Sequence, residues 1–116
     1  MDFLNRAIDQ AKQLQQLAAD ALQKTADQAQ PLVADAVTRA QELQQTLVDQ
    51  APHVQAAAKQ QYDAAVEHAG TFIETGKTVL AQGAQAARPH LETLADQAKK
   101  AADAAVNAVK NAQPKP

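Results

Sequence analysis

The chain contains no cysteine, no serine and no tryptophan, and aromatic residues make up only 3% of its 116 residues. Without cysteine it can form no disulfide, thiolate metal site or thiol nucleophile. Without serine it has no nucleophile of the serine-hydrolase type. No segment alternates with a period of two and β-branched residues are sparse, so a strand-rich fold is not indicated.

Charge of one sign and long apolar runs are also lacking. The formal net charge is −2, so no basic patch indicates a nucleic-acid partner. No run approaches the ~20 apolar residues of a membrane-spanning helix. The N-terminal residues lead into an amphipathic pattern and not into a signal peptide. We therefore expect a cytoplasmic protein.

Catalytic and metal sites find no support in the residue pattern. His53, His68 and His90 are too far apart in sequence for two of them to share a helical turn, so we expect no metal site. No glycine-rich phosphate loop is present, and the carboxylates fall on the polar side of the helices. We expect a non-enzymatic protein without a cofactor.

The chain does contain apolar residues that recur at a regular spacing along almost its whole length. A walk from Ala7 to Val109 in steps of three or four residues, about 3.67 on average, meets an apolar residue at every stop except Gly76. Such an eleven-residue period places these residues in a straight stripe along a helix. Alanine fills roughly half of the stripe and removes little area from water, so we expect strong helicity but weak tertiary packing.

Proline and glycine interrupt this helical pattern. Proline breaks a helix interior but is tolerated in the first turn. The pattern predicts one domain over residues 1–112, a disordered tail over 113–116, and helices near 2–29, 31–50, 52–69, 71–87 and 89–112. The predicted hinges are Pro31, Pro52, Gly70 and Pro89. The stripe keeps its phase through these breaks, which predicts that the helices can also line up end to end on one surface.

A basic row accompanies the stripe in the second half of the chain. Its members recur at intervals of eleven, and they are Lys77, Arg88, Lys99 and Lys110. Basic side chains at such a boundary can lay their methylene groups on apolar material and hold the charge in water, as in helices that lie in a lipid interface. Solvated charges that pair with acids one helical turn away would give the same row. Both interpretations stay open.

Eleven-residue amphipathic repeats interrupted by proline, as at Pro31 and Pro52, resemble those of exchangeable apolipoproteins and apolipophorins. Perilipin-type coats and synucleins share the period, although the synuclein-type KTKEGV consensus is absent. The alanine- and glutamine-rich composition is similar to that of phasins, which coat storage granules. The resemblance covers residues 7–112 and rests on periodicity and composition, so it carries over no functional residue beyond the stripe.

The resemblance implies an all-α fold, an elongated antiparallel bundle of amphipathic helices that opens at its hinges. The stripe would then spread on a lipid or storage-granule surface, because an alanine-rich core costs little to open. Residues 2–17 carry the bulkiest apolar cluster and are expected to make first contact. The residues expected to face lipid are Phe3, Leu4, Ile8, Leu14, Leu22, Val33, Val37, Leu43, Leu47, Val54, Tyr62, Ile73, Leu80, Leu91, Val106 and Val109.

The same pattern fits an alternative function, a soluble helical bundle or coiled coil whose stripe meets protein. Self-association belongs to this alternative, and uninterrupted eleven-residue repeats would favour a right-handed assembly. An ice-binding helix is a third interpretation, but threonine does not recur in register.

Overall fold

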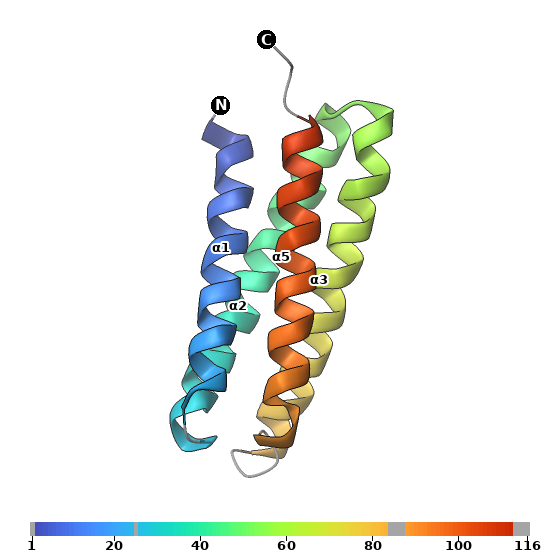
Figure 1. Cartoon of the computed structure of the whole chain (residues 1–116). Coiled ribbons are helices and arrows are strands. Elements are labelled where there is room, and N and C mark those ends of the chain that lie inside the picture. The colour runs from blue at the N-terminus through green and yellow to red at the C-terminus, as the bar shows by residue number, and fades with distance from the viewer. Residues whose placement is uncertain (1, 25, 84–87, 113–116) are drawn as a thin grey trace.

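The computed structural model describes residues 2–24, 26–83 and 88–112 and has four α-helices and two short 3-10 helices within them (Figure 1). In chain order they are α1 (Asp2–Leu22), α2 (Ala26–Gln50), η1 (Ala51–His53), α3 (Ala56–Gln82), η2 (Arg88–His90) and α5 (Leu91–Ala112). The expected all-α fold is confirmed. The expected tail at 113–116, and residues 84–87 of the expected fourth helix, lie outside the described residues.

The helices form an elongated antiparallel bundle with Cα extents of 48 × 20 × 17 Å. α1 packs against α2 and α5, and α3 packs against the same two helices. The pairs α1 with α3 and α2 with α5 therefore lie on the diagonals of the bundle. α1 begins and α5 ends at the same end of the molecule (Figure 1). The predicted bundle architecture is confirmed.

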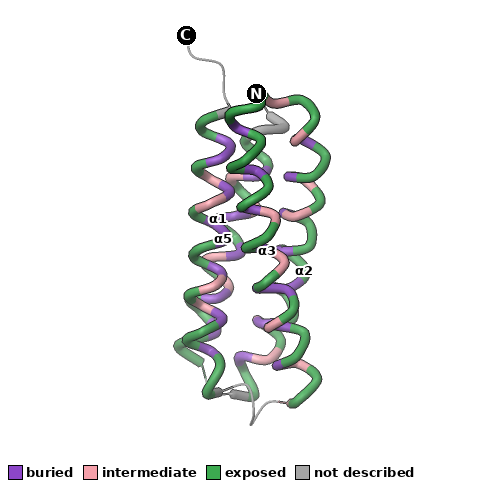
Figure 2. The backbone as a smooth tube through the Cα atoms, turned by 90° about the vertical axis from the view of Figure 1, so that its right-hand side faces the viewer, coloured by how far each residue is buried: buried purple, intermediate pink, exposed green. Residues whose placement is uncertain are grey.

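Buried residues recur along each helix in alternate steps of four and three. In α2 they include Ala29, Val33, Ala36, Ala40, Leu43, Leu47 and Gln50. In α3 they include Ala58, Tyr62, Ala65, Ala69, Phe72, Gly76 and Val79. Figure 2 shows buried positions turned toward the inside of the bundle. A seven-residue repeat keeps one face on its neighbours when helices wrap around one another with a left-handed twist.

The core departs from the eleven-residue stripe at several positions. In each case the stripe residue is half-buried or exposed and the residue before it is buried instead. The pairs, with the stripe residue second, are Ala21 and Leu22, Val79 and Leu80, Leu94 and Ala95, and Ala105 and Val106. An eleven-residue step drifts away from a seven-residue face within a few turns, so a single period applied to the whole chain misses these core positions.

The helix boundary predicted at Pro31 is wrong. α2 continues through Pro31, which lies in the second turn of the helix with its side chain exposed. The missing N–H removes one hydrogen bond near the helix start, where the loss is smallest. Ala29 and Val33 on either side are buried in the core and keep this turn in place.

The chain instead reverses direction between the end of α1 at Leu22 and the start of α2 at Ala26. The N–H of Gln23 donates to the carbonyl of Asp20 (3.1 Å), and that of Lys24 donates to the carbonyl of Ala21 (3.2 Å). These three-residue hydrogen bonds tighten the last turn of α1. The first connection of the bundle therefore comes earlier in the chain than the proline pattern predicts.

The helix boundary predicted at Gly70 is also wrong, because α3 is continuous. Its interior glycines lie where α3 approaches α2. A Cβ added at Gly76 would overlap Cγ2 of Val37, and one added at Gly70 would lie 3.2 Å from Nε2 of Gln44. These glycines permit close helix contact and do not break the helix.

The breaks predicted at Pro52 and Pro89 are confirmed. Pro52 lies in η1 between α2 and α3, and Pro89 lies in η2 directly before α5. Proline suits such a helix start because its missing N–H has no helical partner there. α3 ends earlier than expected, at Gln82, and Gly83 caps it with a φ of 93°, which glycine adopts without steric cost.

Replacing Gly76 by alanine is expected to destabilise the bundle by about 1–3 kcal/mol, because the new methyl group overlaps Val37. Gly70→Ala is the matched control. Its methyl group meets the end of the flexible Gln44 side chain, and alanine is favoured over glycine inside a helix by about 1 kcal/mol. Urea unfolding followed by circular dichroism measures both. Equal effects of the two substitutions would contradict the close helix contact at Gly76.

Candidate functional site

The residues predicted to face lipid form the interior of the bundle. The buried ones are Leu14, Val33, Val37, Leu43, Leu47, Tyr62, Ile73, Leu91 and Val109, and the half-buried ones are Ile8, Val54, Leu80 and Val106. Leu22 is 44% exposed at the end of α1. Phe3 and Leu4 belong to α1, but the structure does not describe their side chains. In this closed form the stripe faces other helices, so it reaches an external surface only if the helices separate.

The core combines large side chains from two helices with alanine from the other two. α2 and α3 bury Val33, Val37, Leu43, Leu47, Tyr62, Phe72, Ile73 and Val79. α1 and α5 bury mainly alanine, namely Ala7, Ala11, Ala18 and Ala21 from α1 and Ala98, Ala101, Ala102, Ala105 and Ala108 from α5. Because alanine carries a single methyl group, the contact between α1 and α5 removes less apolar area per residue than the contact between α2 and α3.

Side-chain hydrogen bonds between helices converge on α3. Within the described residues they are Tyr62 Oη to Gln50 Oε1 (3.0 Å), Gln44 Nε2 to the carbonyl of Val66 (3.2 Å) and Asn111 Nδ2 to Gln61 Oε1 (2.6 Å). The two ion pairs of the same part of the chain, Arg39 with Glu42 and Lys100 with Asp96, each lie within one helix and are exposed. Exposed pairs contribute little to stability, so these hydrogen bonds to α3 do more than the ion pairs to position helices against one another.

Tyr62 and Gln50 form a buried polar pair between α3 and α2. Tyr62 is fully buried and Gln50 is 3% exposed. A buried polar group without a partner is costly, so the hydrogen bond favours the one register of α2 against α3 that makes it. Burial also raises the pKa of the Tyr62 phenol above its ordinary value. Sequence analysis missed Gln50, although the seven-residue spacing from Ala36 through Leu43 leads to it.

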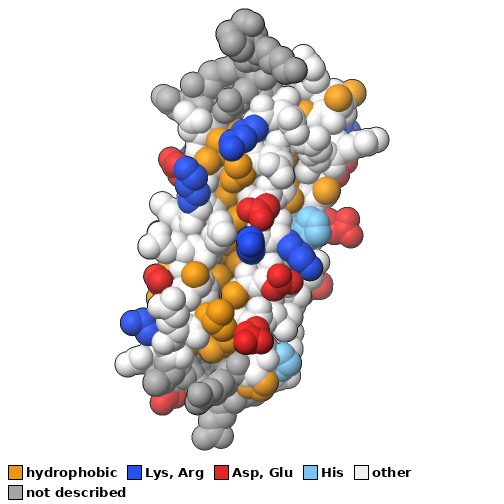
Figure 3. Space-filling model, viewed as in Figure 1, with side chains coloured by type: hydrophobic (Ala, Val, Ile, Leu, Met, Phe, Trp, Pro, Cys, Tyr) orange, Lys and Arg blue, Asp and Glu red, His pale blue; other side chains and the backbone are white. Residues whose placement is uncertain are grey.

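A groove between α1 and α5 carries apolar side chains along the bundle (Figure 3). Asn111 lies on the edge of α5 that contacts α3. By helical spacing the opposite edge faces α1, and it carries Ala95, Lys99, Val106 and Lys110. Two members of the predicted basic row therefore border this groove, with their side chains exposed.

The bundle divides the predicted basic row between two grooves. Lys77 lies seven residues after Gly70, whose position contacts Gln44 of α2, so Lys77 borders the groove between α2 and α3. The side chain of Arg88 lies outside the described ones. The row is continuous only along a chain whose helices lie end to end, and not on the surface of the closed bundle.

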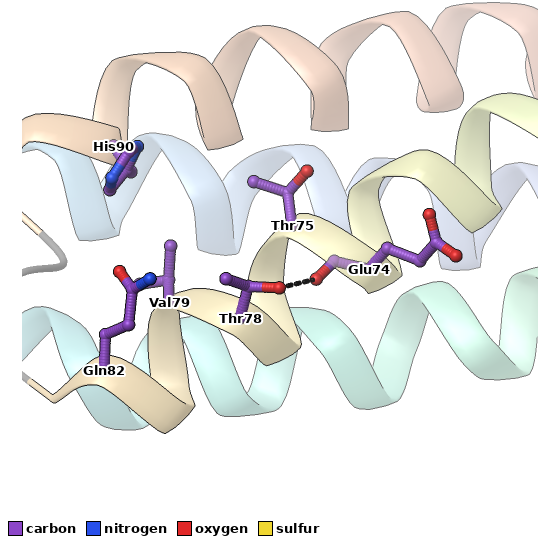
Figure 4. A pocket seen from close by; sticks show the side chains of 6 residues that line it. All are labelled: Glu74, Thr75, Thr78, Val79, Gln82 and His90. Atoms are coloured by element: carbon purple, nitrogen blue, oxygen red, sulfur yellow. Dashed lines mark hydrogen bonds between the residues drawn. The ribbon is translucent and has the colours of Figure 1, made fainter.

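An open hollow near one end of the bundle is lined by Glu74, Thr75, Thr78, Val79, Gln82 and His90 (Figure 4). The Thr78 hydroxyl donates to the carbonyl of Glu74 (3.0 Å), one turn back in its own helix. No three metal-binding side chains come together in the part of the chain that the structure describes. His53, His68 and His90 are all exposed.

No protein-family model, curated protein or solved structure matches the chain. In the described helices, no segment is long and apolar enough to cross a membrane.

The Tyr62 phenol makes the stability of the bundle sensitive to alkaline pH. Because burial raises its pKa above 10.0, folding favours the neutral phenol. This stabilisation is fully present below the unfolded pKa and is lost as the pH rises through the folded pKa. The free energy of unfolding, measured in urea, is expected to fall more steeply above about pH 10 in the wild type than in Tyr62→Phe.

At neutral pH, Tyr62→Phe is expected to cost about 1 kcal/mol, because Gln50 loses this donor. The chain has a single tyrosine, so phenolate absorbance reports its titration directly. An unshifted titration in the folded protein would contradict the buried position of the hydroxyl.

Proposed function

We propose that the protein is a non-enzymatic coat for a lipid or storage-granule surface and binds by separating its helices and turning the stripe outward. One observation carries the proposal: the interior consists of long apolar helix faces in which alanine predominates. Such faces can cover one another or lie on an apolar surface. On this proposal the protein is cytoplasmic and peripheral at that surface.

Exchanging the bundle for a surface costs little apolar burial. Residues buried in the bundle stay buried when each helix lies on the surface, and alanine-rich contacts have little area to lose. A flat surface also covers side chains that the bundle leaves in water. Leu22 and Val48 are 44% and 48% exposed, and Ile8 and Val106 are half-buried. Full burial of a side chain of this kind contributes about 1.5–3 kcal/mol, which favours the surface state.

The basic residues suit the same arrangement. Lys99 and Lys110 lie at the edge of the apolar face of α5, and Lys77 lies at the edge of that of α3. None of these three belongs to either ion pair of the described residues. Their stems can lie along the apolar surface while the ammonium groups stay in water.

A second candidate function is a soluble bundle that acts through protein contacts or self-association. The seven-residue spacing of the buried residues favours it, because that spacing satisfies the apolar faces within one chain. In this case the stripe stays inside and the polar exterior supplies the contacts.

A reversible lock between α1 and α5 tests whether binding needs an open bundle. One cysteine replaces Ala11 or Ala18 in α1 and a second replaces Ala98 or Ala102 in α5, all of them buried. The chain has no cysteine of its own, so the disulfide can form only between the two introduced residues. The pair that oxidises without loss of helicity is used as the lock. We expect the reduced protein to float with phosphatidylcholine vesicles and to gain helicity, and the oxidised protein to stay in the soluble fraction.

The reduced form of the same variant is the matched control, because it differs only in the disulfide. Equal flotation of both forms would reject opening between α1 and α5 as a requirement for binding. If the wild type and the reduced form neither float with vesicles nor bind an oil emulsion, the surface function is wrong and the second candidate stands.

A further inference from the structure

We infer that α1 separates from the bundle before any other helix and leaves α2, α3 and α5 packed together. α1 is joined to α2 through residues 23–25. Its departure breaks its contacts with α2 and α5, while the contacts of α3 with α2 and α5 stay in place. Local opening of one terminal helix is therefore possible without unfolding the whole bundle.

Among the side chains that the structure describes, those of α1 (residues 5–22) contribute the least bulk to the core. Among its described residues, Leu14 is the one large side chain that is fully buried, and Ile8 and Leu17 pack against the core only at its edges. The other terminal helix, α5, buries Leu91, Leu94 and Val109. On these described residues, detaching α1 uncovers one buried large side chain and detaching α5 uncovers three, so we expect α1 to leave at lower cost.

Polar contacts hold the remaining three helices together. Gln44 and Gln50 bond α2 to α3, and Asn111 bonds α5 to α3. α2 and α3 also meet closely at Gly76 and Val37. None of these contacts has a partner on α1, so they all persist when α1 leaves.

A detached α1 needs a new apolar partner. It is a helix of 21 residues, and in proteins most of the stability of a helix comes from the packing of its apolar face, which a detached α1 would lose. A phospholipid surface would cover the face that carries Leu14 and stabilise the helix. α1 would then be the element that first contacts lipid, and this second step rests on the proposed function.

Hydrogen exchange of the full, lipid-free chain, followed by peptide-resolved mass spectrometry, tests the order of opening. We expect amides in the centre of α1 to exchange at least about tenfold faster than those in the centres of α2 and α3. Leu14→Ala and Leu43→Ala are matched variants, since both leucines are fully buried. Leu14→Ala should accelerate exchange in every helix, because the detached state and the fully unfolded state both lack the Leu14 contact. Leu43→Ala should accelerate exchange in α2 and α3 more than in α1, because the packing of α2 on α3 persists when α1 detaches.

Equal exchange rates in α1 and α3 of the wild type would overturn the inference, and so would faster exchange in α5 than in α1. Equal acceleration of α1 and α3 by Leu43→Ala would also overturn it, because α1 would then open only with the whole bundle. The measurement contains no lipid, so its result is distinct from that of flotation. Rapid exchange in α1 without flotation would reject the surface function and retain the early opening of α1.

Discussion

The burial of one apolar face on each long helix is the constraint on which the other features depend. The faces are rich in alanine, which favours helix but yields little free energy when it is covered. In water the four helices cover one another, with buried positions spaced by four and three residues. Because each face is long and regular, a flat apolar surface could cover it as well. The closed bundle and the proposed surface-bound form are therefore two ways of covering the same apolar faces.

The unequal distribution of bulk within the core makes the contacts between helices unequal in strength. α2 and α3 supply most of the large buried side chains, and α3 accepts or donates each described hydrogen bond between helices. α1 and α5 each bury more alanine than large side chains, and they are not consecutive in the chain. The two helices that bury the fewest large side chains, α1 and α5, are therefore packed against each other on one side of the bundle.

The sequence predicted the helical fold and the breaks at Pro52 and Pro89, because both depend on local propensity. It did not predict the continuity of the helices through Pro31 and Gly70. Those positions depend on distant neighbours, since Pro31 lies between residues held in the core and the glycines of α3 face α2. The eleven-residue stripe predicted most of the core residues. The seven-residue spacing of the buried residues becomes visible only when the buried residues of each helix are considered separately. The pairing of Tyr62 with Gln50 depends on how two helices align, which no local pattern contains.

The most direct test of the central claim is the distance between α1 and α5 in protein bound to phosphatidylcholine vesicles. Spin labels are attached at the exposed positions Gln16 of α1 and Asp103 of α5, and the distance is measured by electron–electron double resonance. In the lipid-free protein the bundle cross-section of 20 × 17 Å keeps these helices side by side. We predict that on vesicles the distance grows by an amount comparable to the length of a helix, about 1.5 Å per residue. An unchanged distance in the vesicle-bound protein would show that the closed bundle itself binds, and would contradict the claim that the core and the binding surface are the same residues.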